Sequence, residues 1–173
     1  MRACIADPTM SSSRLTPFAA QLKDVDTPGG HVEFRFASAD DASVLGRLNA
    51  DLIRDEGHRN PMTVAELEGR MRGWLEGEYE AALCESDGAA VGYALFRREP
   101  DHVYLRHLFV REQDRRQGVA AALLDWLWLN AWAGVERVRV DVLVGNSAGL
   151  AFWRAVGFSG YCVTLEMSRQ AGS

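Results

Sequence analysis

The sequence has few cysteines, and they form no recognisable pattern. Cys4, Cys84 and Cys162 are odd in number, far apart along the chain and never part of a Cys-x-x-Cys pair. Disulfide-rich domains and structural zinc sites both require clustered cysteines, so the sequence predicts neither. We expect a protein of a reducing, cytoplasmic compartment with no metal centre.

Long apolar runs and an excess of positive charge are also missing. No stretch approaches the roughly 20 apolar residues of a membrane span, and residues 1–8 lack the apolar core of a secretory signal. The formal net charge of −5 argues against neutralisation of a nucleic-acid backbone. We therefore expect neither a membrane nor a nucleic-acid partner.

The composition suits one compact domain. The chain has 173 residues, of which 47% are hydrophobic and 25% charged, enough apolar surface for a full core. Residues 1–30 contain serine, proline and glycine without a sustained period, which predicts a flexible leader. The domain itself is expected to span residues 31–173.

Apolar periodicity divides this domain into strands and helices. Alternating or continuous apolar residues and turn signals predict strands at 32–36, 80–84, 90–96, 103–110, 138–144 and 161–167. Apolar residues at helical spacing predict helices over 44–53, 67–75, 119–131 and 147–156, with start signals at Ser38 or Asp40, Thr63, Gly118 and Asn146. The order β-α-α-β-β-β-α-β-α-β indicates a mixed α/β or α+β domain.

One junction joins a buried strand to a helix that begins at a glycine. The apolar strand 103–110 is followed by a polar turn, and Gly118 then precedes strong helix formers. Such a junction directs unpaired backbone N–H groups and the positive end of a helix dipole at one point, which suits a phosphate or pyrophosphate. Arg115 and Arg116 add positive charge there. Taken alone, this Arg-x-x-Gly-x-Ala pattern is a weak signal.

Two separated motifs together resemble the GCN5-related N-acetyltransferase (GNAT) family. The pyrophosphate motif of that family, Gln/Arg-x-x-Gly-x-Gly/Ala, is matched at Arg115, Gly118 and Ala120. A second family element, an Asn followed by an aliphatic and aromatic helix and then Gly-Phe, is matched from Asn146 to Phe158. The resemblance implies a GNAT fold, in which helices flank a mixed central β-sheet and two central strands, here 103–110 and 138–144, splay apart.

The resemblance also implies acetyl-CoA as co-substrate. The backbone of residues 108–110 would pair with its pantetheine arm like an added strand, and the N–H groups of residues 116–121 would hold its pyrophosphate. The acetyl-CoA-binding residues expected from the resemblance are Leu108, Phe109, Val110, Arg115, Arg116, Gln117, Gly118, Val119, Ala120, Ala121, Asn146 and Trp153.

Transfer of an acetyl group to an amine requires a base, because an amine of pKa ~10 is mostly protonated at neutral pH. Asp141 is the preferred base, since burial in its apolar strand would raise the pKa of a carboxylate. Some family members that acetylate protein N-termini carry a catalytic Glu at this place. His107 is the second candidate. Each could instead be an ordinary ion-paired or hydrogen-bonded strand residue.

One position departs from the family pattern. Counting from Asn146, the family often has a tyrosine general acid where this chain has Trp153, whose indole cannot supply a proton. Water, Ser147 or Tyr161 could supply it instead. The thiol of CoA, with a pKa of ~8.5, can also leave as a thiolate without much help from a general acid.

The acceptor side is expected at the junction of the first two helices. There Asp55, Glu56 and His58 could recognise a cationic amine, although a solvated helix end is the alternative. The acceptor could be a small amine, an amino acid, an aminoglycoside or a protein N-terminus, because the fold does not fix the substrate. Three tryptophans crowd one helix and either pack in the core or form a patch for a homodimer: Trp126, Trp128 and Trp132.

We therefore predict an acetyl-CoA-dependent N-acetyltransferase that acts by direct transfer. The departure at Trp153 suggests an alternative, a non-catalytic acyl-CoA-binding sensor or interaction module. A generic nucleotide-binding fold is disfavoured, because no Gly-x-Gly-x-x-Gly or Gly-Lys-Ser/Thr follows a first strand.

Overall fold

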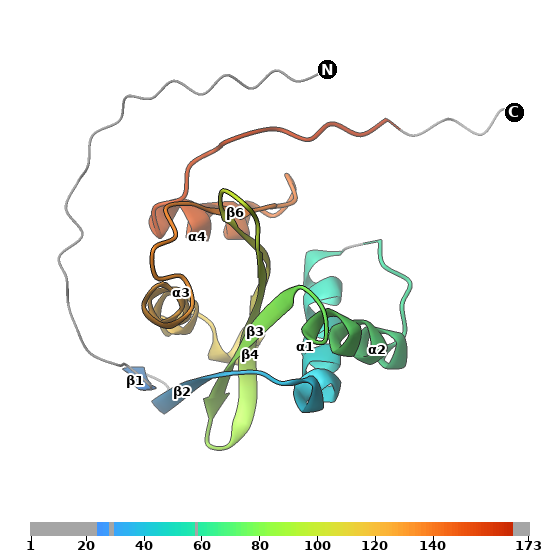
Figure 1. The fold of residues 1–173 in the computed structure, drawn as a ribbon, viewed down its shortest axis with the longest axis vertical. Helices are drawn as coiled ribbons and strands as arrows, with labels where there is room; N and C mark the ends of the chain where they lie inside the picture. Colours follow the sequence, from blue (N-terminus) through green and yellow to red (C-terminus); the bar gives the residue numbers. More distant parts are fainter. Residues whose placement is uncertain (1–23, 28–29, 58, 168–173) are drawn as a thin grey trace, which may run out of the picture.

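A six-stranded sheet in the order β1-β2-β3-β4-β5-β6 forms the middle of the molecule (Figure 1). The computed structural model describes residues 24–27, 30–57 and 59–167. Neighbouring strands from β1 to β5 are antiparallel, whereas β6 is parallel to β5. The strands are β1 (Asp24–Thr27), β2 (Gly30–Phe36), β3 (Tyr79–Ser86), β4 (Ala89–Arg98), β5 (Val103–Val110) and β6 (Val138–Val140).

Four α-helices cover the two faces of this sheet. Helices α1 (Ala42–Glu56) and α2 (Val64–Leu75) lie on one face, and α3 (Val119–Asn130) lies on the other with α4 (Ser147–Ala155) near β6 (Figure 1). The helix start predicted at Thr63 is confirmed and is a capping box: the Thr63 hydroxyl accepts from the Glu66 N–H, and the Glu66 carboxylate accepts from the Thr63 N–H. The helix starts predicted at Gly118 and Asn146 are confirmed as well.

Strand alternation divides the core into one cluster on each face. Leu45, Met71 and Tyr93 belong to the cluster under α1 and α2, and Leu105 and Leu123 belong to the cluster under α3. Each of these five side chains is fully buried, so both faces of the sheet are anchored by apolar packing.

Two of the three tryptophans on and just after α3 are core residues. Trp126 and Trp132 are 6% and 1% exposed, whereas Trp128 is 39% exposed and packs edge-on against Trp132 with ring centroids 5.4 Å apart. Core packing therefore accounts for most of this aromatic cluster.

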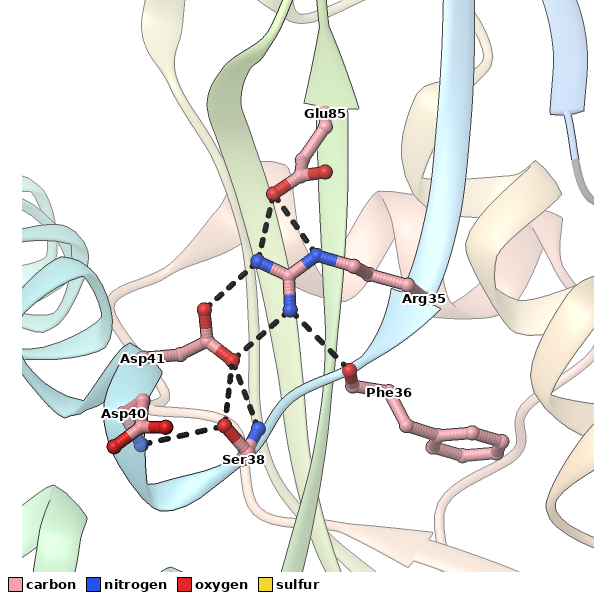
Figure 2. A network of polar contacts seen from close by, with 6 residues as sticks. All are labelled: Arg35, Phe36, Ser38, Asp40, Asp41 and Glu85. Carbon is pink, nitrogen blue, oxygen red and sulfur yellow. Dashed lines mark hydrogen bonds and ion pairs between the residues drawn. The ribbon is translucent and has the colours of Figure 1, made fainter.

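A charged network fixes the junction between β2 and α1 (Figure 2). Arg35 donates to Asp41 at 2.7 Å and to Glu85 on β3 at 2.8 Å. Asp41 also accepts from the Ser38 N–H at 2.8 Å, and Ser38 is the N-cap of a short 3-10 helix, Ala39–Asp41, that precedes α1. The Arg35 guanidinium lowers the pKa of the Asp41 carboxyl below its ordinary value.

The last predicted strand is wrong, and the one before it is shorter than predicted. β6 ends at Val140 rather than at residue 144, and residues 161–167 form no strand. Val144 is 90% exposed and Leu165 is 89% exposed. Alternating apolar residues satisfy the strand pattern, but a strand also needs a hydrogen-bonded neighbour, and none lies beside these residues in the part of the chain that the structure describes.

The N-terminal stretch expected to be a leader contributes one strand. Within it, Asp24–Thr27 pairs with β2 as β1, with Asp26 opposite His31. Residues 1–23, 28 and 29 lie outside the described residues, so the domain boundary at residue 31 stays a prediction. No helix within the described ranges has both the length and the apolar character needed to cross a bilayer.

Candidate active site

Strands β5 and β6 part soon after they meet. Only three residue pairs join them, Val103 with Val138, Tyr104 with Arg139 and Leu105 with Val140. β5 continues along β4 to Val110, and in the described part of the chain no strand covers its other edge from residue 106 onward. This edge offers main-chain groups to an extended ligand, as the expected splay requires.

A β-bulge marks the point of separation. Leu95 on β4 is opposite His107, but the next residue on β4, Phe96, is opposite Leu105, so Arg106 is an extra residue on β5. A bulge bends its strand and increases the local twist. Here it also turns two consecutive side chains to the same face, because both Arg106 and His107 contact the Trp74 ring of α2.

A buried chain of polar groups holds His107 in place. Its Nδ1 lies 3.0 Å from the Tyr93 hydroxyl, and Asn49 links Tyr93 to Arg70, whose guanidinium donates to the Asn49 carbonyl oxygen at 2.7 Å. Tyr93 has no exposed surface, and burial raises the pKa of its phenol. The hydroxyl therefore stays protonated, and the imidazole is oriented rather than loosely placed.

Asp141 lies directly after the last residue of β6. Its carboxylate accepts a 2.9 Å hydrogen bond from the Tyr104 hydroxyl of β5, so the pair bridges the two strands where they separate. Burial, with the Asp141 hydrogen bond second, raises the pKa of Tyr104 to about 12. The burial expected for Asp141 is absent, because β6 ends before it and the side chain is exposed.

The turn between β5 and α3 presents unpaired N–H groups. The N–H groups of residues 116–121 have no hydrogen-bond partner among the described residues. Arg116 and Gly118 have φ angles of 59° and 83°, and a Cβ built on Gly118 would meet no atom within 4 Å. Left-handed backbone followed by a helix start forms a concave set of donors, so the turn fits a pyrophosphate.

Arg115 ties this turn to the rest of the site. Its Nε donates to the Val110 carbonyl at 2.7 Å, its guanidinium pairs with Asp55 at the end of α1, and its Cζ lies 5.5 Å from the Phe109 ring centroid. Arg115, which was expected to bind acetyl-CoA, therefore contacts Asp55, which was expected to bind the acceptor. Arg116 is exposed, and Gln117 donates to the Gln113 carbonyl.

An open cavity of about 720 Å³ lies between the end of α1 and the start of α4. Asp55, Glu56 and Asn146 are among its lining residues. Asn146 caps α4 by accepting from the Gly149 N–H at 2.8 Å, and its amide nitrogen lies 3.4 Å from the Glu56 carboxylate. His58, the third expected acceptor residue, lies outside the described residues.

Trp153 is 9% exposed and packs in the core cluster on the α3 face. Its ring centroid lies 5.1 Å from that of Phe152 and 4.9 Å from that of Phe158. The side chain therefore holds α4 onto the domain, and a contact with the cofactor stays a prediction.

Several residues of the site were not found from the sequence. Tyr104 donates to Asp141, Trp74 contacts His107, and Arg70 and Arg106 both lie over the Trp74 ring. Arg70 and Trp74 are four residues apart on one helix, a spacing that could have drawn attention to them. The sequence had no signal for Arg106, because only the bulge turns it toward Trp74. Among the described residues, no group of three or more His, Cys, Asp or Glu is placed to hold a metal.

Comparison with known proteins gives a family match over most of this region. The profile of the "Acetyltransferase (GNAT) family" matches residues 47–158. No curated protein sequence matches the chain.

Solved structures share the fold at low sequence identity. A ribosomal-protein-alanine N-acetyltransferase from Brucella melitensis biovar Abortus 2308 is 18% identical, with a TM-score of 0.67 over 80% of this chain and 99% of its own. A predicted acetyltransferase with acetyl-CoA from Clostridium acetobutylicum is 17% identical, with a TM-score of 0.65 over 79% of this chain and 96% of its own. An aminoglycoside N-acetyltransferase in complex with CoA is also 17% identical, with a TM-score of 0.64 over 82% of this chain and 96% of its own.

Proposed function

We propose that this chain, which belongs to the GNAT acetyltransferase family, transfers an acetyl group from acetyl-CoA directly to a primary amine. The observation that supports this most strongly is a line of main-chain groups that no neighbouring strand or helix pairs among the described residues. It begins at the uncovered edge of β5 and ends at the N–H groups of residues 116–121. An extended arm ending in a pyrophosphate is the ligand chemistry that fits such a line.

The residues present fit acetyl-CoA. The main chain of residues 108–110 would hold the pantetheine arm, and the N–H groups of residues 116–121 would hold the pyrophosphate. When bound, acetyl-CoA supplies an activated acyl group as a thioester. Two of the structural neighbours contain CoA or acetyl-CoA, which supports the assignment.

Two bases are available on the face of the sheet that carries Trp74. We assign the proton transfer to Asp141, which Tyr104 holds at the point where β5 and β6 part. A carboxylate held by a hydrogen bond can accept the proton that a neutral amine loses as its nitrogen forms the new C–N bond and the thiolate of CoA leaves. His107 is the second candidate, and its orientation through Tyr93 supports it. The N–H groups of residues 108–110 are the proposed oxyanion donors.

The proposal is tested by calorimetry with acetyl-CoA, followed by thiol release across a panel of amines. We expect saturable acetyl-CoA binding and amine-dependent release of CoA. A well-folded protein that shows no acetyl-CoA binding would contradict the proposal.

Trp153 supports the second candidate, an acyl-CoA sensor without turnover, because an indole replaces the usual tyrosine acid. The same panel separates the two functions. Tight acetyl-CoA binding without thiol release on any amine identifies the sensor.

A further inference from the structure

Two arginines lie over one tryptophan ring beside the candidate bases. The guanidinium carbons of Arg70 and Arg106 are 4.7 Å and 4.8 Å from the Trp74 ring centroid. Arg70 comes from the same helix as Trp74, whereas Arg106 is the extra residue of the β5 bulge. Two separate elements thus bring two positive charges to one aromatic ring.

No carboxylate neutralises this pair within the described part of the chain. Neither Arg70 nor Arg106 forms an ion pair there. Arg70 donates to Asn49 and to the Met62 sulfur, and its Nε–H is buried without a partner. Burial, with repulsion from Arg106 second, lowers the pKa of Arg70. Arg70 is half-buried and Arg106 is exposed, so the pair is open to solvent on one side and can bind an external anion.

The arginine pair adjoins the expected reaction centre rather than the pyrophosphate turn. Arg106 precedes His107 in sequence, and His107 contacts the same Trp74 ring at a centroid distance of 5.9 Å. The pyrophosphate turn begins past the other end of β5, after Val110. An acceptor whose nitrogen reaches Asp141 or His107 would therefore place its neighbouring substituents beside the two guanidinium groups.

We propose that the Arg70–Arg106 pair over Trp74 binds a carboxylate of the acceptor, so that the substrate is an amine that also carries a carboxylate, such as an amino acid. This inference rests on the proposed acetyltransferase function. Arginine suits the role because its planar fork can bind a carboxylate through two hydrogen bonds. This proposal modifies the expectation of a purely cationic acceptor. Asp55, which was expected to recognise a cationic amine, is already paired with Arg115.

The test compares amino acids with their carboxamides, which keep the amine and side chain but lose the anion. Wild-type protein is expected to acetylate the acid of at least one matched pair with a higher kcat/KM than the amide. In Arg106→Gln this preference should fall by about ten- to a hundredfold, since a charge-assisted hydrogen bond contributes roughly 1.5–3 kcal/mol. Arg70→Gln should act in the same direction.

A matched control and a binding measurement make the result decisive. Arg47→Gln removes an exposed arginine of α1 outside this cluster and should leave the acid-over-amide ratio unchanged. Calorimetric titration of each acid and amide into the protein with CoA present provides the ratio of affinities without turnover.

Three outcomes overturn the inference. Equal kcat/KM for acids and amides in wild type shows that no carboxylate is recognised. An equal loss for both in Arg106→Gln shows that the arginine only supports packing. A higher KM for acetyl-CoA instead of the amine shows that the pair holds the cofactor. If no amine releases CoA, the proposed function fails, and the affinity ratio from calorimetry then decides the inference alone.

Discussion

Gly118 is the residue on which the proposed pyrophosphate site depends most directly. Its φ of 83° is costly for any residue with a Cβ, by about 1–2 kcal/mol. The space beside it is open and lies among unpaired N–H groups. Backbone strain and ligand access therefore coincide at one position.

These two effects can be separated with Gly134 as the control. Gly134 has a φ of 78° and equally open surroundings, but it lies in the turn after α3. Gly118→Trp and Gly134→Trp should lose similar stability in urea denaturation. Calorimetry should show an affinity loss for acetyl-CoA of about tenfold or more only in Gly118→Trp, which corresponds to at least 1.4 kcal/mol. Equal affinities in both variants would remove the turn from the binding site.

Asp141 and His107 can be ranked as bases by substitution. Asp141→Asn should lower kcat by about 10²–10⁴-fold, the usual contribution of a general base, and should leave the Kd of acetyl-CoA unchanged. His107→Asn serves as the comparison. A larger kcat loss in His107→Asn would transfer the role to the histidine.

At the scale of elements, the Arg35 network sets the geometry of the β2–α1 junction (Figure 2). The folded-state pKa of Asp41 lies below its unfolded value. Its contribution to stability is therefore present above the unfolded pKa of about 3.9, and it is lost as the pH falls through the lower, folded-state pKa.

Asp41→Asn should lower the free energy of unfolding at neutral pH by about 1–3 kcal/mol, because charged hydrogen bonds to Arg35 and Ser38 are weakened. The difference from wild type should vanish under acid conditions below the folded pKa. Urea denaturation across this pH range measures both effects. Asp40→Asn, which alters an exposed neighbouring residue, should change the free energy of unfolding little. If Asp41→Asn lowered the free energy of unfolding by the same amount at every pH, the proposed link between Asp41 ionisation and stability would be wrong.

Helix starts and both ends of β5 were predictable from the sequence, whereas the end of β6 was not. The caps at Thr63 and Asn146 involve side chains within three residues, so local sequence determines them. The end of β6 depends on whether β5 remains alongside, and that depends on the bulge at Arg106. For the same reason the turn at Gly118 was predicted and the Arg70–Arg106 pair was not.

At the scale of the whole molecule, residues 161–167 form an unusual surface. Four alternating apolar residues are 62–95% exposed: Tyr161, Val163, Leu165 and Met167. β6 is also the last strand of the sheet, with one edge uncovered in the described structure. Exposed edges and extended apolar segments favour pairing with another chain. We therefore expect two copies of the chain to form a homodimer through this segment.

Light scattering after size-exclusion chromatography should show a dimer, and Leu165→Glu should shift it to monomer because the charge disfavours burial. Leu129→Glu introduces the same charge at another exposed leucine, on α3, and should leave the dimer intact. A monomeric wild-type protein over a wide range of concentration would contradict this expectation, and so would dissociation by Leu129→Glu alone.

The three residue pairs that join β6 to β5 make the main-chain attachment of β6 short. A ligand bound on both sides of the separation would add to this attachment, contributing about 2.7 kcal/mol at a concentration of 100 times its Kd. Amide hydrogen exchange in residues 138–156 should then slow by about a hundredfold with acetyl-CoA, while β3 and β4 change much less. Uniform slowing across the sheet would contradict this view. Acetyl-CoA supply would thus govern how often the C-terminal part of the domain opens, and with it the lifetime of the protein against proteases.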